Sequence, residues 1–494
     1  MKKQAIKDLF RRYSDIKFPS DELGATRIIP KITVNEVKSD SLLFITDRVS
    51  DRDTAFDFSE CCEIPIAAVA SHTKNIIKAK CPIIRVGNPR AALAFAVSNS
   101  CMIDYEKIKI IGVTGTNGKT TTATLIYEML RRCGYKAGFI GTGKIFSDGV
   151  LLSEETYSMT TPDPTLLYPS IAKMQDDGCE YIVMEISSHS ISLGKIAPIR
   201  FEYAIFTNLD DDHLDFHGSK EEYFKAKLNL FSLAKRGLFN LDDEYSKRAS
   251  QLVGCKVSTF GILNEGDAYA TEISENNLSP VSFFYRADNL IFKAETRLIG
   301  QFNAYNALAA LKCLIDLGIK PCIAKRALAQ IENVEGRMQS FDGEIRALID
   351  YAHTPSAFLN CLKSAKQSIN SKQKLIVVFG CGGDRDKSKR SIFGMQAEKY
   401  ADIIIITEDN SRCEKLESIV DDITSGIKHK KYEVIPDRET AIRRAFDLAT
   451  GGDVVAVIGK GHERYKIIEN EYIPFDERKI IIDAMKRKAS SLCE

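Results

Sequence analysis

The chain has 494 residues, of which 44% are apolar and 27% are charged, and its formal net charge is +1. This length exceeds what one hydrophobic core can organise, so we expect roughly two to four domains. The near-neutral charge gives no reason to expect nucleic acid or an anionic membrane surface as a partner. The 13 cysteines include no C-x-x-C pair, which argues against a compact zinc site and for reduced thiols.

No targeting or membrane-spanning segment is evident in the sequence. Residues 1–18 carry charges but lack an apolar core of signal-peptide length. No apolar run approaches the roughly 20 residues needed to cross a bilayer. We therefore expect a cytoplasmic protein, and we expect it to be a monomer.

The apolar runs divide the chain into three predicted units. Residues 1–105 carry short runs separated by polar turns, which is typical of a small α/β domain. Residues 106–335 carry longer runs that are apolar continuously rather than alternately, as in parallel strands buried on both faces. Residues 336–494 show this second pattern again. We expect an α/β protein with three domains, including a central P-loop-type parallel-sheet domain and a C-terminal Rossmann-like domain.

Individual elements follow from the same patterns, in chain order. The expected strands of the first two units are at 41–45, 64–70, 83–86, 108–113, 181–186 and 204–209. Residues 264–300 alternate around turn residues at 287–289, which predicts a hairpin. Residues 302–318 predict a helix that ends at Gly318. The expected strands of the third unit are at 345–349, 375–379, 403–407 and 454–458.

Polar residues and glycines follow several of these strands at the points where they end. Glu185 follows one strand of the central unit, and residues 208–213 follow another. In the last unit the corresponding segments are 380–386, 409–412 and 459–463. Ligands of open parallel sheets bind beyond the carboxyl ends of the strands. The sequence therefore predicts two facing ligand-binding edges, with chemistry in the cleft between them.

The segment IIGVTGTNGKTTTATL at 110–125 has the layout of a phosphate-binding loop between a strand and a helix. Backbone N–H groups of such a loop and of the following helix attract phosphate oxygens. Lys119 would add a positive charge near the β- and γ-phosphates, and the Thr120 hydroxyl would bind Mg²⁺. The general motif has a glycine where Val113 stands, so this loop departs from it by one position.

Mg²⁺ bound with a nucleotide needs hard oxygen ligands. Glu185, in VMEISSHS, stands at a predicted strand end and is one candidate. The segment NLDDDHLDFHG at 208–218 crowds acidic and imidazole side chains into one short loop. Taken alone, a carboxylate such as Glu185 is more often a solvated loop residue, whereas the crowded loop favours a metal or substrate role by itself.

A series of short motifs occurs in the order found in Mur ligases, and the chain resembles this family from about residue 108 to its end. The motifs are GVTGTNGKTTT, TTPDP, MEISSHS, NLDDDHLDFHG, YFKAKLNLF, FNAYNALAA, EGRMQ, DYAHTP, FGCGGDRDKSKR, DNSR and GKGHE. The shifted glycine of the phosphate loop is the form that this family uses. Residues 1–105 resemble the family less, since TVNEVKSDSLLFI stands where the family has a DSR triplet.

The resemblance implies an ATP-dependent ligase of peptidoglycan precursor synthesis. ATP would phosphorylate the D-glutamate carboxylate of UDP-N-acetylmuramoyl-L-alanyl-D-glutamate, and the amine of meso-diaminopimelate would attack the resulting acyl phosphate. A carboxylate is a poor electrophile at neutral pH, and phosphorylation supplies a leaving group. Phosphoryl transfer itself depends chiefly on positioning and charge neutralisation.

The resemblance also implies roles for individual residues. The ATP-binding set is Gly115, Thr116, Asn117, Gly118, Lys119, Thr120, Thr121, Asn303, Asn306, Arg337, Asp350 and His353. The Mg²⁺ ligands are Thr120, Glu185, His213 and Lys227, with Lys227 carried as a carbamate formed from CO₂. The catalytic set is Lys119, Lys227 and His213. By sequence alone Lys227 would be a surface helix lysine, and the asparagines would be helix caps.

Two further sets would hold the substrates that are joined. The UDP-sugar peptide set is Thr160, Thr161, Ser187 and Lys195, and the diaminopimelate set is Arg385, Asp409, Asn410, Arg412, Gly459 and Glu463. A guanidinium can grip the distal carboxylate of diaminopimelate bidentately, and Glu463 can pair with the distal ammonium. L-Lysine lacks that carboxylate and would leave Arg412 unpaired, so such a site can reject lysine roughly 10⁴-fold.

Three other interpretations stay open at this stage. The same ligation could use L-lysine, because Ser411 stands where many diaminopimelate-adding ligases have proline, and Lys195 stands where the family usually has arginine. A folylpolyglutamate-synthetase-like ligase would also join an amino acid to a carboxylate, although DNSR, GKGHE and the N-terminal unit favour the muramyl peptide. A nucleotide-binding regulator that has lost catalysis is the third. The intact Lys119, Glu185, His213 and Lys227 argue against it.

Overall fold

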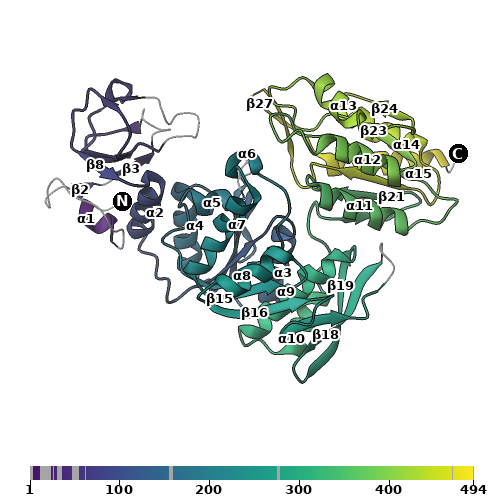
Figure 1. Cartoon of the computed structure of the whole chain (residues 1–494), viewed down its shortest axis with the longest axis horizontal. Helices are drawn as coiled ribbons and strands as arrows, with labels where there is room; N and C mark the ends of the chain where they lie inside the picture. Colours follow the sequence, from purple (N-terminus) through teal and green to yellow (C-terminus); the bar gives the residue numbers. More distant parts are fainter. Residues whose placement is uncertain are drawn as a thin grey trace.

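The computed structural model describes residues 4–11, 24–25, 27–30, 36–46, 55–61, 63–154, 160–274, 279–469 and 471–492. Part of the stretch that replaces the DSR triplet, residues 33–35, lies outside these ranges, as does most of the charged N-terminal segment 1–18. Three main sheets follow one another along the chain and lie from left to right in Figure 1. None of the helices within the described ranges is long and apolar enough to cross a membrane.

The N-terminal sheet has four parallel strands in the order β3 (Arg27–Pro30), β4 (Ser41–Phe44), β6 (Ala67–Ser71) and β8 (Ile83–Val86). The strand predicted at 64–70 begins only at Ala67, because Pro65 has no N–H to donate to a neighbouring strand. Helix α2 (Pro89–Ser100) follows, and the Asn88 side chain caps it by accepting from the N–H groups of Arg90 and Ala91.

Smaller elements complete the N-terminal part. They are β1 (Gln4–Ala5), α1 (Ile6–Leu9), β2 (Gly24–Ala25), β5 (Phe56–Asp57), the 3₁₀ turn η3 (Phe58–Glu60) and β7 (Ile76–Ile77). Strands β1 and β2 pair antiparallel, and β5 and β7 pair parallel. Helix α2 packs against helix α4 (Pro164–Asp176) of the central part and so joins the first two parts of the molecule.

The central sheet has eleven strands among the described residues. Their order is β12 (Val150–Glu154), β11 (Lys144–Ser147), β10 (Ala137–Gly141), β13 (Tyr181–Glu185), β9 (Lys109–Thr114), β14 (Phe201–Phe206), β15 (Ala234–Asn240), β16 (Lys256–Gly261), β17 (Ala268–Thr271), β18 (Pro280–Ala287) and β19 (Leu290–Ile299). In this order, the neighbouring strands from β10 through β13, β9, β14, β15 and β16 to β17 pair parallel. The pairs formed by β12 and β11, β11 and β10, β17 and β18, and β18 and β19 are antiparallel.

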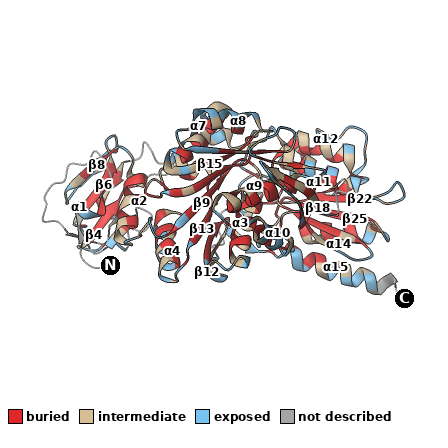
Figure 2. Cartoon of the chain, turned by 90° about the horizontal axis from the view of Figure 1, so that it is seen from below, coloured by how far each residue is buried: buried red, intermediate tan, exposed pale blue. Residues whose placement is uncertain are grey.

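The continuous apolar runs have a simple cause in this sheet. Ile110 and Ile182 face one hydrophobic core, whereas the next residue of each strand, Ile111 and Val183, faces the other. Successive strand residues point to opposite faces, so a sheet covered on both sides needs apolar residues at every position. Figure 2 shows these buried strands between layers of helices whose outer faces are exposed.

The helices of the central part connect its strands. They are α3 (Lys119–Arg132), α4, α5 (Ser188–Ser192), α6 (Leu214–His217), α7 (Lys220–Leu228), the 3₁₀ turn η4 (Asn229–Leu233), α8 (Glu244–Leu252), α9 (Phe302–Asp316) and α10 (Pro321–Ala329). The hairpin predicted within 264–300 is confirmed by β18 and β19. The helix predicted at 302–318 ends at Asp316, and Gly318 adopts a φ of 92° just beyond it.

One predicted strand of the central part is shifted. The sequence predicts a strand at 204–209, but β14 covers Phe201–Phe206. Thr207 and Asn208 leave the sheet because they bind the phosphate loop: the Thr207 hydroxyl donates to the carbonyl of Asn117 at 2.6 Å, and the Asn208 side chain accepts from the Asn117 N–H at 2.9 Å.

The C-terminal sheet has six strands among the described residues. Their order is β20 (Gln339–Phe341), β21 (Arg346–Asp350), β25 (Val454–Ile458), β22 (Leu375–Phe379), β23 (Ile403–Ile406) and β24 (Tyr432–Val434), all parallel except β20. The helices are α11 (Pro355–Gln367), α12 (Arg390–Tyr400), α13 (Leu416–Thr424), α14 (Arg438–Leu448) and α15 (Glu477–Leu492). A hairpin, β26 (Tyr465–Ile468) and β27 (Glu471–Pro474), precedes α15.

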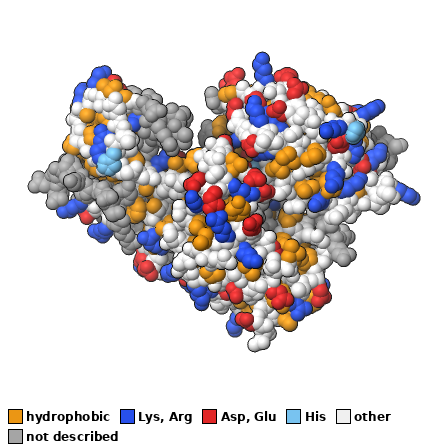
Figure 3. Space-filling view, in the orientation of Figure 1, with side chains coloured by type: hydrophobic (Ala, Val, Ile, Leu, Met, Phe, Trp, Pro, Cys, Tyr) orange, Lys and Arg blue, Asp and Glu red, His pale blue; other side chains and the backbone are white. Residues whose placement is uncertain are grey.

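The predicted α/β class, with a central parallel sheet and a Rossmann-like C-terminal sheet, is confirmed by these topologies. The C-terminal sheet is covered on both faces by two separate hydrophobic cores, as in doubly wound folds. Acidic and basic side chains are interspersed over the face of the molecule drawn in Figure 3, in keeping with the near-zero net charge. The domain boundaries at residues 105 and 335 stay predictions.

Candidate active site

The predicted meeting of strand ends from two sheets is observed as a cleft of about 490 Å³. Its central wall is formed by residues 116–121, which are the end of the loop after β9 and the first residues of α3, by Glu185 at the end of β13, and by residues that follow β14. Its C-terminal wall is formed by residues that follow β21, β22, β23 and β25. One cleft therefore brings the phosphate loop together with the polar segments of the last sheet.

The phosphate loop is fixed by two glycines with positive φ. Gly115 has a φ of 148°, and a Cβ there would lie 1.9 Å from the Thr207 hydroxyl. Gly118 has a φ of 83° at the N-cap position of α3, so the N–H groups of the first helical turn stay available for an anion. The Lys119 ammonium donates to the carbonyls of Gly115 at 2.9 Å and Thr116 at 2.8 Å. The loop thus forms a preorganised phosphate cradle.

Lys227 reaches the same loop from helix α7. Its side chain is buried and its ammonium donates to the Gly115 carbonyl at 2.8 Å. Burial and the nearby Lys119 lower the pKa of Lys227 well below its usual range. Burial also lowers the pKa of Lys119, although the carboxylates of Glu185 and Asp212 oppose that shift. The surface position that sequence alone suggests for Lys227 is therefore wrong.

Glu185, at the end of β13, accepts hydrogen bonds from three donors. The Thr120 hydroxyl donates to its Oε2 at 2.7 Å, and Thr142 donates through its N–H at 3.0 Å and its hydroxyl at 3.3 Å. The Arg337 guanidinium donates in turn to the Thr120 hydroxyl at 2.9 Å. The half-buried Thr120 and the buried Glu185 therefore present hard oxygens side by side at the phosphate loop, which is the donor chemistry that Mg²⁺ prefers.

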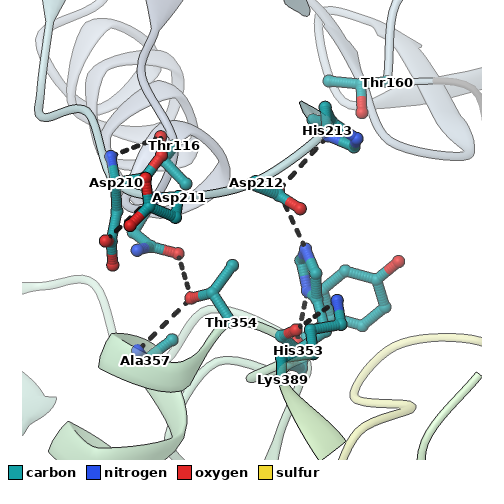
Figure 4. A network of polar contacts seen from close by, with 12 residues as sticks. Thr116, Thr160, Asp210, Asp211, Asp212, His213, His353, Thr354, Ala357 and Lys389 are labelled. Carbon is teal, nitrogen blue, oxygen red and sulfur yellow. Dashed lines mark hydrogen bonds and ion pairs between the residues drawn. The ribbon is translucent and has the colours of Figure 1, made fainter. Parts of the chain in front are cut away.

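Asp212 lies between two histidines from different parts of the chain (Figure 4). Its carboxylate is 3.3 Å from Nε2 of His213 and 3.9 Å from Nε2 of His353. Burial lowers the pKa of His213 to about 3 and the pKa of His353 to about 4. Both imidazoles are neutral at pH 7, the form in which histidine binds metals. The carbonyl of His353 also accepts from Lys389 at 2.9 Å.

A second contact joins the phosphate loop to helix α11 in the same view. The side-chain oxygen of Asn117 accepts from the Thr354 hydroxyl at 3.2 Å (Figure 4). Its amide nitrogen donates to the Ser356 hydroxyl at 3.1 Å. Together with the bond between Arg337 and Thr120, these contacts hold the C-terminal part against the phosphate loop.

A pocket of about 450 Å³ opens beside the phosphate loop. Its walls include Gly118, Asn306, Arg337, Asp350 and His353, all of which belong to the predicted ATP-binding set. Another member of that set, Asn303, lines neither this pocket nor the cleft. It accepts from the Asn306 amide at 2.8 Å and so orients that side chain. That each of these residues contacts ATP stays a prediction.

Of the residues predicted to hold the UDP-sugar peptide, some line the cleft and others do not. Thr160 lines the cleft, whereas Thr161, Ser187 and Lys195 do not. The Thr161 hydroxyl donates to the Glu185 carbonyl at 3.0 Å and accepts from the Ser187 N–H at 3.1 Å. Lys195 is buried, and its ammonium lies 2.7 Å from the Asp163 carboxylate.

The predicted diaminopimelate set lies together at the C-terminal end of the cleft. Every member lines it: Arg385, Asp409, Asn410, Arg412, Gly459 and Glu463. Asn410 donates to Oε2 of Glu463 at 2.8 Å, and the fully buried Lys460 donates to Asn410 at 2.9 Å and to Glu463 at 3.2 Å. Burial opposes ionisation of Asp409, but Lys460 and Arg438 outweigh it and lower the pKa of that carboxyl.

Two loops are joined to place Arg412 at the cleft. The Gly383 N–H donates to the Asn410 carbonyl at 2.9 Å, and Nη1 of Arg412 donates back to the Gly383 carbonyl at 2.8 Å. Arg412 itself has a φ of 52°. Burial and the neighbouring Arg385 lower the pKa of Arg412. Behind the loops, the buried Arg390 holds the Glu414 carboxylate bidentately at 2.8 and 2.7 Å.

Several residues of this site were not singled out from the sequence. They are Asp212, Tyr351, Lys389, Arg390 and Lys460. All five lie inside motifs that are recognisable in the sequence, so these motifs could have pointed to them. The motifs are NLDDDHLDFHG, DYAHTP, FGCGGDRDKSKR and GKGHE. Among the described residues no group of three or more His, Cys, Asp and Glu side chains is arranged to hold a metal. The predicted Mg²⁺ ligands include only two such residues, beside a threonine and a lysine.

Two solved structures with a similar fold differ in their sequence identity to this chain. A structure of UDP-N-acetylmuramoyl-L-alanyl-D-glutamate–2,6-diaminopimelate ligase matches with a TM-score of 0.66 and 26% identity, and covers 99% of both chains. The folylpolyglutamate synthase of Mycobacterium tuberculosis, complexed with ADP and AMPPCP, matches with a TM-score of 0.63 at 14% identity. It covers 75% of this chain and 92% of its own, and this likeness shows the fold alone.

Sequence comparison gives the family. The UDP-N-acetylmuramoyl-L-alanyl-D-glutamate–2,6-diaminopimelate ligase of Syntrophomonas wolfei is 35% identical over 468 residues, which cover 92% of each chain. Residues 113–314 match the Mur ligase middle domain, and residues 336–461 match the glutamate ligase domain of Mur ligases. The chain belongs to the Mur ligase family.

Proposed function

We propose that this protein is an ATP-dependent ligase that adds meso-diaminopimelate to the D-glutamate carboxylate of UDP-N-acetylmuramoyl-L-alanyl-D-glutamate, a step of peptidoglycan precursor synthesis. One observation carries the proposal: a phosphate loop and a cluster of alternating charges face each other across a single cleft. The identity of 35% to a ligase named for this reaction, over nearly the whole chain, supports the same conclusion.

The reaction needs two steps at one carboxyl group. In the first, a carboxylate oxygen of D-glutamate attacks the γ-phosphorus of ATP and ADP leaves. In the second, the neutral amine of the amino acid attacks the acyl phosphate carbon, phosphate leaves with its bonding electron pair, and the nitrogen loses a proton. Lys119 and the N–H groups at the start of α3 neutralise the charge on the transferring phosphoryl group.

The residues at the phosphate loop fit Mg²⁺ in part. Thr120 and Glu185 offer the hard oxygens described above, and His213 is neutral. The ammonium form of Lys227 would repel a cation, whereas its carbamate would supply an anionic oxygen ligand. When bound, Mg²⁺ would supply charge neutralisation for the phosphates of ATP. We infer that Thr120, Glu185, His213 and carbamylated Lys227 would hold it.

The surroundings of Lys227 favour carbamate formation. A lysine reacts with CO₂ only as the neutral amine, and the lowered pKa of Lys227 raises the neutral fraction at physiological pH. The reaction forms an N–C bond and releases one proton, which turns a cationic side chain into an anionic one. The same Lys119 ammonium that disfavours a charged Lys227 would then pair with the carbamate.

The substrates occupy different parts of the proposed site. ATP binds at the phosphate loop, with its nucleoside in the pocket beside Asn306 and Asp350. The UDP-sugar peptide approaches Thr160 from the N-terminal side. We assign residues 1–105, 106–335 and 336–494 to UDP binding, ATP binding and amino-acid binding, and expect a cytoplasmic monomer.

The charges at the C-terminal end of the cleft suit a diamino diacid. The Arg412 guanidinium would bind the distal carboxylate and Glu463 the distal ammonium. L-Lysine as the added amino acid is the alternative that leaves Arg412 without a carboxylate. A folylpolyglutamate-type ligation has less support, because that neighbour is only 14% identical and covers 75% of the chain.

Phosphate release measured with UDP-N-acetylmuramoyl-L-alanyl-D-glutamate and ATP tests the proposal directly. We expect release only when meso-diaminopimelate is also present, and roughly 10⁴-fold lower kcat/KM with L-lysine or L-ornithine. Lys119→Ala should lower kcat by roughly 10³-fold while leaving the fold intact by circular dichroism. Equal turnover with L-lysine would move the assignment to the lysine-adding reaction, and turnover of a folate alone would overturn it.

A further inference from the structure

Tyr351 forms a wall shared by the cleft and the nucleoside-side pocket. It follows β21 directly, and its N–H donates to the Gly336 carbonyl at 3.0 Å, which fixes its backbone. A Cβ on Gly461 would lie 2.6 Å from the Cβ of Tyr351, so the two backbones are in close contact. The tyrosine ring is therefore held between the part of the site proposed for ATP and the part proposed for the amino acid.

The hydroxyl of Tyr351 reaches the amino-acid end of the cleft. It donates to Oε1 of Glu463 at 3.2 Å. The other oxygen of that carboxylate, Oε2, already accepts from Asn410 at 2.8 Å and from Lys460 at 3.2 Å. Oε1 is thus the oxygen that keeps acceptor capacity for an incoming ammonium, and Tyr351 sets its direction. Burial and the adjacent Glu463 raise the pKa of Tyr351, so this hydroxyl keeps its proton.

The ring of Tyr351 reaches the phosphate loop through an arginine. The Arg337 guanidinium carbon lies 4.6 Å from the ring centroid, within cation–π distance. The same guanidinium donates to the Thr120 hydroxyl at 2.9 Å, and its buried Nε has no hydrogen-bond partner among the described residues. A phosphate bound at Thr120 would compete for this guanidinium, because charge-assisted bonds are stronger than a bond to a hydroxyl.

We propose that Tyr351 is a positioning residue that couples nucleotide binding to capture of the amino acid by Glu463. The contacts form a continuous chain from Thr120 through Arg337 and the tyrosine ring to Oε1 of Glu463. Nucleotide shifts the Arg337 guanidinium, the ring follows because the two are in cation–π contact, and the hydroxyl aims Oε1 into the cleft. This inference rests on the proposed function.

The coupling is a free energy shared by two sites, so it must be reciprocal. The nucleotide raises the affinity for the amino acid by the same factor by which the amino acid raises the affinity for the nucleotide. Such an arrangement would favour occupation of the amino-acid site in molecules that already hold ATP. The wall position of Tyr351 means that it acts through Arg337 and Glu463 rather than on the reacting atoms.

Tyr351→Phe tests the proposal, because it keeps the ring on Arg337 and removes only the hydroxyl. Isothermal titration of the full chain with meso-diaminopimelate is run with and without a non-hydrolysable ATP analogue and Mg²⁺. We expect the analogue to lower the Kd of the wild type about fivefold or more, and to leave the Kd of Tyr351→Phe nearly unchanged. In turnover, the KM for diaminopimelate should rise about tenfold while kcat stays within about twofold. Because the coupling is reciprocal, the KM for ATP at saturating diaminopimelate should also rise, by about the coupling factor that is lost.

Tyr285→Phe is the matched control, since the Tyr285 hydroxyl is buried on β18 with no hydrogen-bond partner among the described residues. It should retain the nucleotide effect in full. The inference is overturned if Tyr351→Phe keeps the wild-type nucleotide effect and KM, or if nucleotide leaves the wild-type affinity for diaminopimelate unchanged. A wild type that neither binds nor turns over diaminopimelate would overturn the proposed function itself, and this inference with it.

Discussion

The ammonium groups of Lys119 and Lys227 share one acceptor, the carbonyl oxygen of Gly115, at 2.9 and 2.8 Å. Two like charges at one buried oxygen repel each other, and burial makes the repulsion harder to screen. Burial lowers the pKa of both lysines, and the neighbouring Lys119 lowers that of Lys227 further. This pair is costly in the free protein and becomes favourable once an anion lies between the two side chains.

Activity should depend on dissolved CO₂ through Lys227. Enzyme freed of CO₂ should lose most of its phosphate release with substrates present, and bicarbonate should restore it, because the neutral amine of Lys227 forms a carbamate. Lys227→Met should be roughly 10³-fold less active at any bicarbonate concentration, since the anionic ligand is gone. Nuclear magnetic resonance with ¹³C-labelled bicarbonate should show a carbamate signal in the wild type alone.

Lys225→Met is the control for this experiment, because Lys225 lies on the same helix with its side chain in solvent and paired with Glu222 at 2.8 Å. It should keep the activity, the bicarbonate response and the carbamate signal of the wild type. Full activity in Lys227→Met would contradict a role for a carbamate at this position.

Arg412 should set the choice of amino acid. Its Nη1 is used by the carbonyls of Gly383 and Asn410, whereas no hydrogen bond within the described part of the chain reaches its Nη2 or Nε. Those nitrogens would bind the distal carboxylate of diaminopimelate, so Arg412→Lys should lower kcat/KM for diaminopimelate roughly 10²-fold. The kcat/KM for L-lysine should stay within about threefold, because L-lysine has no distal carboxylate.

The two amino acids are compared in parallel kinetics, with Arg444→Lys as control. Arg444 lies on α14 and pairs with the exposed Glu433 at 3.0 Å, away from the cleft. An equal loss of kcat/KM for both amino acids in Arg412→Lys would argue for a general defect of the loop instead of a lost carboxylate contact.

The sequence predicts the sheets well because burial on both faces leaves a direct signature. Ile110 and Ile111 pack into different cores, so the run around them is apolar throughout, and the strand was predicted within one residue at each end. The strand at 204–209 was misplaced because Thr207 and Asn208 bind the phosphate loop, a contact between segments about 90 residues apart. Apolar periodicity carries no information about such contacts.

The candidate site was predictable where a recognisable motif carries its residues. The phosphate loop, Glu185 and the DNSR segment were found because short motifs hold them. The resemblance singles out Lys227 in YFKAKLNLF, but composition and charge alone treat it like Lys225, which is exposed on the same helix. The pairing of Lys460 with Asn410, 50 residues away, likewise depends on how β23 and β25 are placed in the sheet.

Gly383→Ala should separate the two loops that place Arg412 at the amino-acid-binding end of the cleft. A Cβ at Gly383 would lie 1.8 Å from the Ser411 carbonyl oxygen, which belongs to backbone and cannot move aside cheaply. The bonds from Gly383 to Asn410 and Arg412 would then break. We expect the KM for diaminopimelate to rise at least about tenfold with the KM for ATP nearly unchanged.

Initial-rate kinetics with each substrate varied in turn measure this effect. Gly254→Ala is the control, because a Cβ at Gly254 would meet nothing within 4 Å. If Gly383→Ala leaves the KM for diaminopimelate unchanged, the joined loops do not position Arg412.

His462 should make the protein less stable in acid. Burial lowers its pKa to about 3, and neither of its ring nitrogens has a hydrogen-bond partner among the described residues. The folded state therefore binds fewer protons than the unfolded state between pH 6.5 and about 3, so stability falls as pH falls through that window, by up to about 1.4 kcal/mol per pH unit for this group. His462→Phe should remove that slope, and urea unfolding at pH 7 and pH 5 should then show a smaller difference than in the wild type. An unchanged difference would mean that the imidazole finds a partner or water in solution.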